Sequence, residues 1–271
     1  MNIFLAALRY EFRMQVRKRA VWLVPALSVL LVLLIGASLF RDLFDTSEGQ
    51  VAAKTAMIGL GLQLNALLPI GYGCLLADRL IRDDRLRVAS ILDATPARQG
   101  PRLLGKYLGA ATATAIPIVV IYAALTGAYA VITGAPAAPG WALATFSLVM
   151  LPGLLFVAAF ALAVPLIMPA PMFRVLFVGY WFWGNLVGPA AMPTLAHSVI
   201  QPVGGYPINA LLDDHGRDGD LILAGPVPGA VLNFLRPEPT ALAGWLSIAV
   251  LLALAAGALV GSQALRARRA R

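Results

Sequence analysis

Between Leu108 and Thr133 the chain reads LGAATATAIPIVVIYAALTGAYAVIT, and no Asp, Glu, Lys or Arg interrupts it. A helix needs about 20 apolar residues to cross the hydrocarbon of a bilayer. A charged residue at the centre of such a helix costs about 2.5–3.5 kcal/mol on insertion, so the absence of charge is informative. Inside lipid every backbone N–H and C=O must be bonded within its own segment, which a helix achieves and an open strand does not. The stretch therefore predicts a membrane-spanning helix.

Five further windows without charge lie on either side of it. The six predicted spans cover residues 21–40, 56–77, 108–133, 141–168, 175–193 and 240–262. Pro152 and Pro165 fall inside the fourth, and a proline within a helix favours a kink. The composition agrees, because 60% of the residues are hydrophobic and 13% are charged, against about 45–50% and 25% in soluble domains. The sequence therefore predicts an all-α polytopic membrane protein that forms a single transmembrane domain over residues 1–271.

The distribution of basic residues predicts the orientation. The chain has 21 Lys and Arg against 13 Asp and Glu, a formal net charge of +8. If the N-terminus is cytoplasmic, 17 of the 21 basic residues fall in cytoplasmic segments and 4 in external ones. Cytoplasmic loops of membrane proteins carry the excess of Lys and Arg, so both termini are predicted to be cytoplasmic. These charges would lie beside anionic lipid, which accounts for the basic balance without a nucleic-acid partner.

The N-terminal segment, residues 2–19, predicts an amphipathic helix that lies on the inner leaflet. Arg9, Arg13 and Arg17 recur at helical spacing on one face. The neighbouring apolar face consists of Leu5, Leu8, Phe12 and Val16. The alternative interpretation is a basic flank that only fixes the topology.

Two connecting segments are long. Residues 78–107 are charged and predicted to be cytoplasmic. Residues 194–239 are rich in Pro and Gly and predicted to be external. Their apolar pieces at 208–212 and 230–235 are too short to span a bilayer, so they predict short helices that dip into the outer leaflet and return.

The sequence predicts no catalytic residue, cofactor site or metal site in this chain. Gly100–Tyr107 fits the phosphate-binding pattern G-x-x-x-x-G-K, but Tyr107 stands where a P-loop needs the Ser or Thr that holds magnesium. Cys74 is the single cysteine, which excludes an intrachain disulfide or a multi-cysteine cluster. His197 and His215, the two histidines, leave little for a zinc site.

Neutral polar and aromatic residues are the candidates for a pathway or a dimer interface. Ion-coupled carriers generally keep Asp, Glu, His or Arg inside the membrane. The predicted spans hold none of these, so the energy for transport is predicted to come from another polypeptide. The aromatic run in the fifth span suits either a lipid-facing belt or a pathway wall, and small residues four apart suit close helix packing. The candidates are Gln63, Asn65, Phe177, Tyr180, Trp181, Asn185, Gly257 and Gly261.

The order of the segments and one motif carry a family resemblance. Residues 82–98 read RDDRLRVASILDATPAR, and Leu104-Gly105-Lys106-Tyr107 opens the third span. This pattern resembles the membrane subunit of an ABC transporter of the ABC-2 (type V exporter) family. The layout agrees over the whole chain, whereas the motif covers only residues 82–107. The chain departs from the family where Gly-Thr-Leu-Glu is frequent, because residues 87–90 read RVAS.

The resemblance implies a function and a set of partners. Residues 2–19 would be an elbow helix, and 194–239 would hold the re-entrant helices that close the external exit. The segment around residues 83–92 would be a coupling helix seated in a groove of a separate P-loop ATPase, which binds ATP and magnesium. The implied contact residues are Asp83, Asp84, Arg85, Leu86, Arg87, Ile91 and Leu92. Two copies, or one copy and a related subunit, would form the pathway in a bacterial inner membrane.

Two other functions remain open at this point. An ion-coupled secondary transporter would move its substrate with a proton or sodium gradient and without ATP. A non-transport scaffold, or a subunit of a membrane enzyme complex, would have no pathway of its own. The transported substrate is not predicted, because no group in the spans is selective for one.

Overall fold

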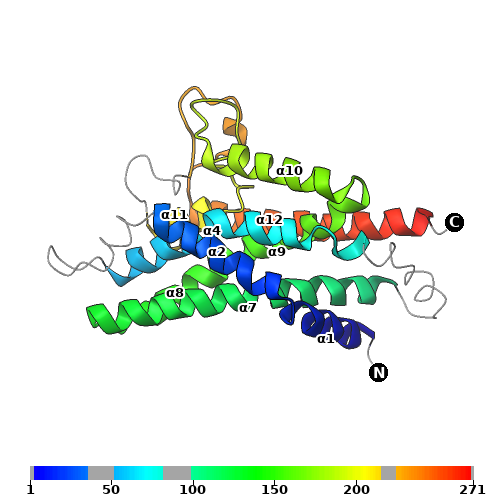
Figure 1. Ribbon diagram of the computed structural model, residues 1–271. Coiled ribbons are helices and arrows are strands. Elements are labelled where there is room, and N and C mark those ends of the chain that lie inside the picture. Colours follow the sequence, from blue (N-terminus) through cyan, green and yellow to red (C-terminus); the bar gives the residue numbers. More distant parts are fainter. Residues whose placement is uncertain (1–2, 36–51, 82–98, 215–223, 270–271) are drawn as a thin grey trace.

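The structure is a computed structural model that describes residues 3–35, 52–81, 99–214 and 224–269, and the regular elements in these ranges are all helical. Four helical stretches are long and apolar enough to cross a membrane (Figure 1). They are Ala53–Ile81, Gln99–Thr133, Ala138–Leu166 and Ala241–Arg268. These stretches coincide with the second, third, fourth and sixth predicted windows. The all-helical fold and the transmembrane character are therefore confirmed.

The other two predicted spans correspond to shorter helices. Helix α2 (Arg19–Ile35) has 17 residues within the described range. Helix α10 (Ala170–Trp181) continues as a π-helical turn, η3 (Phe182–Leu186), after which the backbone at Val187 is extended. The predicted windows reached residues 40 and 193, so the described helices do not establish a count of six spans.

Helix α7 (Gln99–Thr133) begins nine residues before the predicted span and has 35 residues. At 1.5 Å per residue it is about 52 Å long, well beyond the ~30 Å of hydrocarbon in a bilayer. The end of the predicted cytoplasmic segment is thus helical and continuous with the span. The seven predicted ATPase contacts, Asp83 to Leu92, lie outside the described residues.

The fourth predicted span changes its helical form at two places. It consists of α8 (Ala138–Thr145), the π turn η1 (Phe146–Met150), α9 (Leu151–Ala163) and the 3-10 turn η2 (Val164–Leu166). Pro152 follows the π turn and Pro165 lies in the 3-10 turn. Because proline lacks an N–H and crowds the preceding turn, the carbonyls one turn earlier need other partners. The helical form therefore changes next to both prolines, and the kink itself stays a prediction.

Helix α4 (Ala53–Leu76) forms the centre of the bundle. Its side chains contribute much of the buried core, including Ile58, Leu64 and Leu68, and it packs on α2, α8 and α9. Helices α7 and α12 (Ala241–Arg269) expose apolar residues such as Val131 and Leu242. Exposed apolar faces on long helices suit contact with lipid rather than with water.

The described parts of the segment before α12, residues 194–214 and 224–240, contain two short helices, α11 (Gly205–Leu211) and the 3-10 turn η4 (Asn233–Leu235). Helix α11 is largely buried and packs on α12 and η1. The predicted apolar piece 208–212 overlaps α11, and the piece 230–235 contains η4. Both are short, as predicted, but α11 is covered by protein.

Both ends of the chain lie at one end of the bundle (Figure 1). Helix α1 (Ile3–Val16) packs along the beginning of α7, and the last turns of α12 extend in the same direction. The end of the Ala53–Ile81 stretch and the beginning of α7, which flank residues 82–98 in the sequence, lie at this end as well. An even number of crossings would produce this arrangement.

Candidate functional site

The last turns of the Ala53–Ile81 stretch, residues 74–81, contact three other helices through charged side chains; we call them the α4 junction. The junction leads directly into residues 82–98. Arg79 of the junction contacts α1. Asp78 and the Cys74 carbonyl contact α10, and the Leu80 carbonyl contacts α12.

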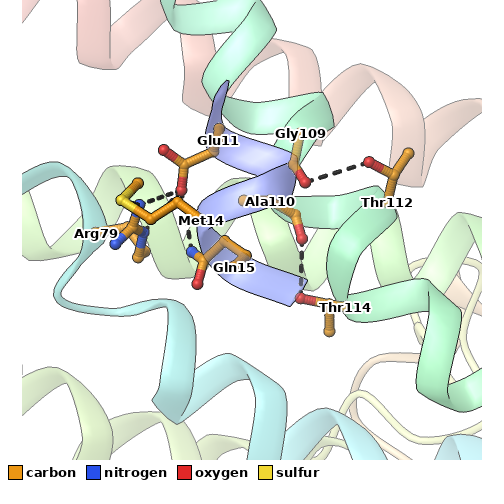
Figure 2. A network of polar contacts seen from close by, with 8 residues as sticks. All are labelled: Glu11, Met14, Gln15, Arg79, Gly109, Ala110, Thr112 and Thr114. Atoms are coloured by element: carbon orange, nitrogen blue, oxygen red, sulfur yellow. Dashed lines mark hydrogen bonds and ion pairs between the residues drawn. The ribbon is translucent and has the colours of Figure 1, made fainter. Parts of the chain in front are cut away.

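The contact with α1 is a buried ion pair (Figure 2). Arg79 is 8% exposed and Glu11 is 5% exposed. Arg79 donates from Nε to Glu11 Oε1 at 2.8 Å and also from Nη2 to the same oxygen. Gln15 donates a further hydrogen bond to Glu11 at 3.1 Å, and Arg79 Nη2 lies 3.8 Å from Met14 Sδ. Breaking such a pair by removing one partner is costly, because the other charge stays buried.

Two glycines of α7 determine where α1 lies. A Cβ at Gly105 would come within 2.6 Å of the Phe4 carbonyl oxygen, and one at Gly109 within 2.6 Å of the Leu8 carbonyl oxygen. Only glycine allows the two backbones to approach this closely. In the sequence Gly105 belongs both to the failed P-loop pattern and to the motif at residues 104–107, and its spacing to Gly109 is the signal for this close contact.

The buried face of α1 differs from the predicted one. Glu11 and Gln15 are its buried residues, whereas Leu5, assigned to the apolar face, is 56% exposed. Within the chain the helix is held by α7 and by Arg79, and its contact with the inner leaflet stays a prediction. Periodicity could not reveal the contact with Arg79, because the partner of Glu11 lies 68 residues away.

Helices α10 and α12 reach the junction through arginines. Arg174, in the first turns of α10, donates from Nη2 to Asp78 Oδ2 and from Nε to the Cys74 carbonyl at 3.2 Å. Arg266, near the end of α12, donates from Nη2 to the Leu80 carbonyl at 3.2 Å. The junction contains no nucleophile–base pair among these residues. Its hydrogen bonds and ion pairs connect the end of the α4 stretch to three other helices.

Asn65 is used for packing at the opposite half of the bundle. Its Nδ2 donates to the carbonyls of Pro202 and Val203, each at 3.1 Å. Asn65 lies 12 residues after the start of α4, about 18 Å along the helix. Residues 202 and 203 therefore lie well inside the bundle, beside the middle of α4. They also lie close to α9, because a side chain at Gly153 would collide with the Pro202 carbonyl. Gln63, by contrast, has a buried side-chain oxygen without a hydrogen-bond partner.

Asn185 and Trp181 complete this contact. Gln201 donates to the Asn185 carbonyl at 3.2 Å, and Asn185 Nδ2 donates to the Trp181 carbonyl at 3.1 Å. Trp181 is fully buried and donates from its indole to the Ala66 carbonyl at 2.6 Å. The structure thus brings three predicted candidates, Asn65, Trp181 and Asn185, close to residues 201–203.

The remaining candidates face elsewhere. Phe177 stacks on Phe173 with 5.5 Å between ring centroids and lies over Gly73 of α4, where a side chain would collide with its ring. Tyr180 and Phe177 both border a cavity between α9, α10 and α12. Gly257 and Gly261 have open space where a Cβ would stand, so this part of α12 is uncovered within the chain.

We call residues 194–211 and 224–240 the cap, because hydrogen bonds tie their two ends together. Arg236, only 1% exposed, donates to the Thr194 carbonyl at 2.7 Å and to the Ala196 carbonyl at 3.0 Å. Tyr206 donates to the Pro237 carbonyl at 2.5 Å. Burial and the nearby Arg236 charge lower the pKa of His197, whose backbone is left-handed at φ 61°. The pattern of prolines did not indicate a buried arginine here.

No protein-family model matches this chain, and a comparison with curated proteins finds no match.

Proposed function

We propose that this chain is the membrane-spanning permease subunit of an ATP-driven exporter of the ABC-2 type, without ATPase activity of its own. Residues 82–98 would bind a separate P-loop ATPase, which holds ATP and magnesium. The observation that supports this most strongly is the α4 junction. A partner acting on residues 82–98 would pull on a point to which α1, α10 and α12 are all attached.

The contacts at the junction suit the transmission of force. Residues 82–98 continue directly into residue 81 on one side and into α7, at Gln99, on the other. The Glu11–Arg79 pair is buried, and electrostatic attraction is stronger where water is excluded. The planar guanidinium groups of Arg79 and Arg174 each donate more than one hydrogen bond, which fixes direction as well as distance. A displacement of the junction would therefore be shared among five helices.

The finer topology follows the same proposal. Helix α2 has 17 residues, and α10 with η3 has the same length; about 25 Å of helix is near the lower limit for a span. With these two, six spans place both termini and the junction on one side, and the excess of Lys and Arg assigns that side to the cytoplasm. Helix α1 is then the elbow helix, and residues 202–211 are the re-entrant external segment.

One bundle of six spans forms half of a pathway, so we propose a dimer with an identical or related subunit. Gly257 and Gly261, which are uncovered on α12, suit close packing against a second copy. Asn65 and Asn185 bond to backbone groups within the chain, which is the behaviour of packing residues and weakens the ion-coupled alternative. No nucleic acid is part of the proposal.

The test uses the predicted contact residues and a matched control. Leu86→Asp and Ile91→Asp place a charge in the proposed apolar docking surface, and Ser90→Asp adds the same charge between them. We expect both docking variants to lose co-purification with the ATPase subunit and ATP-dependent transport in proteoliposomes, and Ser90→Asp to retain both. Unchanged binding and transport in both docking variants would remove the coupling assignment.

Two further results would reject the proposal as a whole. One is robust ATP hydrolysis by the homogeneous chain alone, because the proposal assigns hydrolysis to the partner. The other is transport that follows an imposed proton or sodium gradient in vesicles without ATP, which would favour an ion-coupled carrier.

A further inference from the structure

A cavity of about 340 Å³ lies between α9, α10 and α12. Its inner wall is buried and apolar, with Phe156 and Val157 on α9 and Phe173 and Phe177 on α10. Tyr180 supplies the one polar side chain among the described residues that line it. A water molecule needs two to four polar partners to occupy a buried space favourably, so this space is unsuited to water.

The cavity exists because α10 stands away from its neighbours. The close packing of α10 is with α4 and the turn η2, while α9 and α12 make at most marginal contact with it. Figure 1 shows α10 separated from both helices along its length. Phe177 of α10 lies against Gly73 of α4, and Arg174 connects the first turns of α10 to the α4 junction.

The cavity opens sideways from the bundle. Leu176 on α10 and Leu254 on α12 line it and are 50% and 41% exposed. Leu254 lies near the middle of α12, and the inner wall lies on α9; both belong to membrane-length stretches. The opening is therefore at the depth of the hydrocarbon, where the surrounding medium is acyl chains rather than water.

We infer that this cavity binds one hydrocarbon chain of a membrane lipid. A second copy of the chain could not insert a helix, because a helix with side chains is about 10–12 Å across and the cavity has the volume of a small-molecule site. A narrow flexible acyl chain can enter between Leu176 and Leu254 and cover the apolar inner wall. No charged side chain lines the cavity within the described part of the chain, which matches an uncharged tail.

This inference requires only that the chain is embedded in a membrane, and it does not depend on the proposed exporter function. The bound chain would act as a spacer that keeps α10 away from α9 and α12. The inner wall is inaccessible from outside the chain, since Val157 is fully buried and Phe156 nearly so. Phe160 is partly exposed, whereas Phe156 is only 7% exposed. Chemical contact between a lipid tail and Phe156 therefore reports entry and cannot arise from lipid that merely surrounds the protein.

The test is photo-crosslinking in phosphatidylcholine nanodiscs with a phosphatidylcholine that carries a diazirine near the end of one acyl chain. We expect label on Phe156 as well as on the exposed surface of α2. Leu254→Trp fills the opening and should lower labelling of the inner wall, relative to α2, about tenfold, which is the factor for about two fewer buried methylene groups. Leu252→Trp changes a similarly exposed residue of α12 that does not line the cavity, and should leave the ratio unchanged.

Two results would overturn the inference. Label confined to exposed and partly exposed residues of the wild-type chain, with none on Phe156, would show that no acyl chain enters; this arm stands even if Leu254→Trp fails to fold. A disulfide between two copies of a Leu176→Cys, Cys74→Ala variant would instead assign the opening to a subunit interface.

Discussion

The α4 junction and the cap are both held by arginines, but the arginines bind different acceptors. At the junction Arg79 and Arg174 pair with carboxylates, Glu11 and Asp78. In the cap Arg236 donates to main-chain carbonyls, and within the described residues no carboxylate lies in ion-pair contact with it. Asn65 and Tyr206 also donate to carbonyls of the cap or its flank. The α4 junction connects helices through pairs of charged side chains, whereas in the cap side chains bond to the backbone and hold its path.

This difference has physical consequences. A charge pair requires both partners, so it can be broken, restored or rearranged by a change in either one, which suits a joint between helices that move. A main-chain carbonyl is present whatever side chain follows it, so a backbone-directed bond shapes a loop without depending on the sequence of that loop. We therefore expect the junction to respond strongly to single charge changes, and the cap to respond to loss of its donors.

Loss of the buried pair at the junction should have the largest effect. Glu11→Ala leaves Arg79 buried without its partner, and such changes cost about 3–5 kcal/mol of stability. Thermal unfolding of the purified chain in detergent measures the loss. Arg13→Ala, which removes an exposed charge from the same helix, should change stability by no more than about 0.5 kcal/mol. A double variant, Glu11→Leu with Arg79→Met, should recover most of the lost stability, and equal effects of Glu11→Ala and Arg13→Ala would refute the buried pair.

Close packing of α1 on α7 should be the next most sensitive feature. Gly109→Leu places atoms against the Leu8 backbone, which cannot move aside as a flexible side chain can, and should cost about 2–3 kcal/mol. Hydrogen exchange of the α1 amides should rise in this variant. Gly127→Leu on the same helix has open space around it and serves as the control. Unchanged protection of α1 in Gly109→Leu would mean that the two helices do not pack through this glycine.

At the cap, Asn65 and Gln63 offer a matched pair on one helix. Asn65→Leu leaves the carbonyls of Pro202 and Val203 without their donor, and should cost about 1–2 kcal/mol. Gln63→Leu removes a buried oxygen that already lacks a partner, and should be neutral or stabilising. The unfolding midpoints of the two variants, compared with that of the wild type, measure these changes in stability. A larger loss for Gln63→Leu than for Asn65→Leu would contradict the hydrogen bonds from Asn65 to residues 202 and 203.

The smallest expected effect is a pH dependence in the cap. Because burial and Arg236 lower the pKa of His197 below its ordinary value near 6.5, the unfolded chain binds a proton before the folded one does. The contribution of His197 is complete above pH 6.5 and decreases as pH falls from there towards the folded pKa. Hydrogen exchange of the cap amides between pH 7.5 and 5 measures this decrease. His197→Asn, which tolerates the left-handed backbone, should abolish it; an unchanged slope in that variant would assign the effect to another group.

The membrane character of the chain was predictable because hydrophobicity is a local property. Charge-free windows located all four membrane-length stretches, and Pro152 and Pro165 marked the irregular turns of the third of them. The contacts at the junction were not predictable, because Arg79 and Glu11 meet through folding across 68 residues and each resembles an ordinary basic or acidic flank. The assignment of Asp83–Leu92 to ATPase docking remains a prediction.

In the candidate site, too, residue types were predictable from the sequence, whereas contacts between distant residues were not. Residue type alone marked Asn65 and Asn185 as candidates for a pathway or a dimer interface. In the structure both donate to backbone carbonyls of the chain. Arg236 was overlooked, since nothing in a Pro-rich loop distinguishes an arginine directed at carbonyls from an exposed one. Gly105 and Gly109 could have been recognised from their spacing alone.

The π turn at Phe146–Met150 means that the side chains of α8 and α9 do not follow one continuous α-helical spacing. One additional residue in a turn rotates everything after it by about 100° relative to a regular α-helix. A deletion of one residue between 146 and 150 would restore regular α-helical geometry. It would also rotate one half of the helix relative to the other, and so turn either Leu154 and Val157 or Ala138 and Ala142 out of the core. Length at this point is therefore under tighter constraint than side-chain identity, and related chains should tolerate substitutions here more readily than gaps.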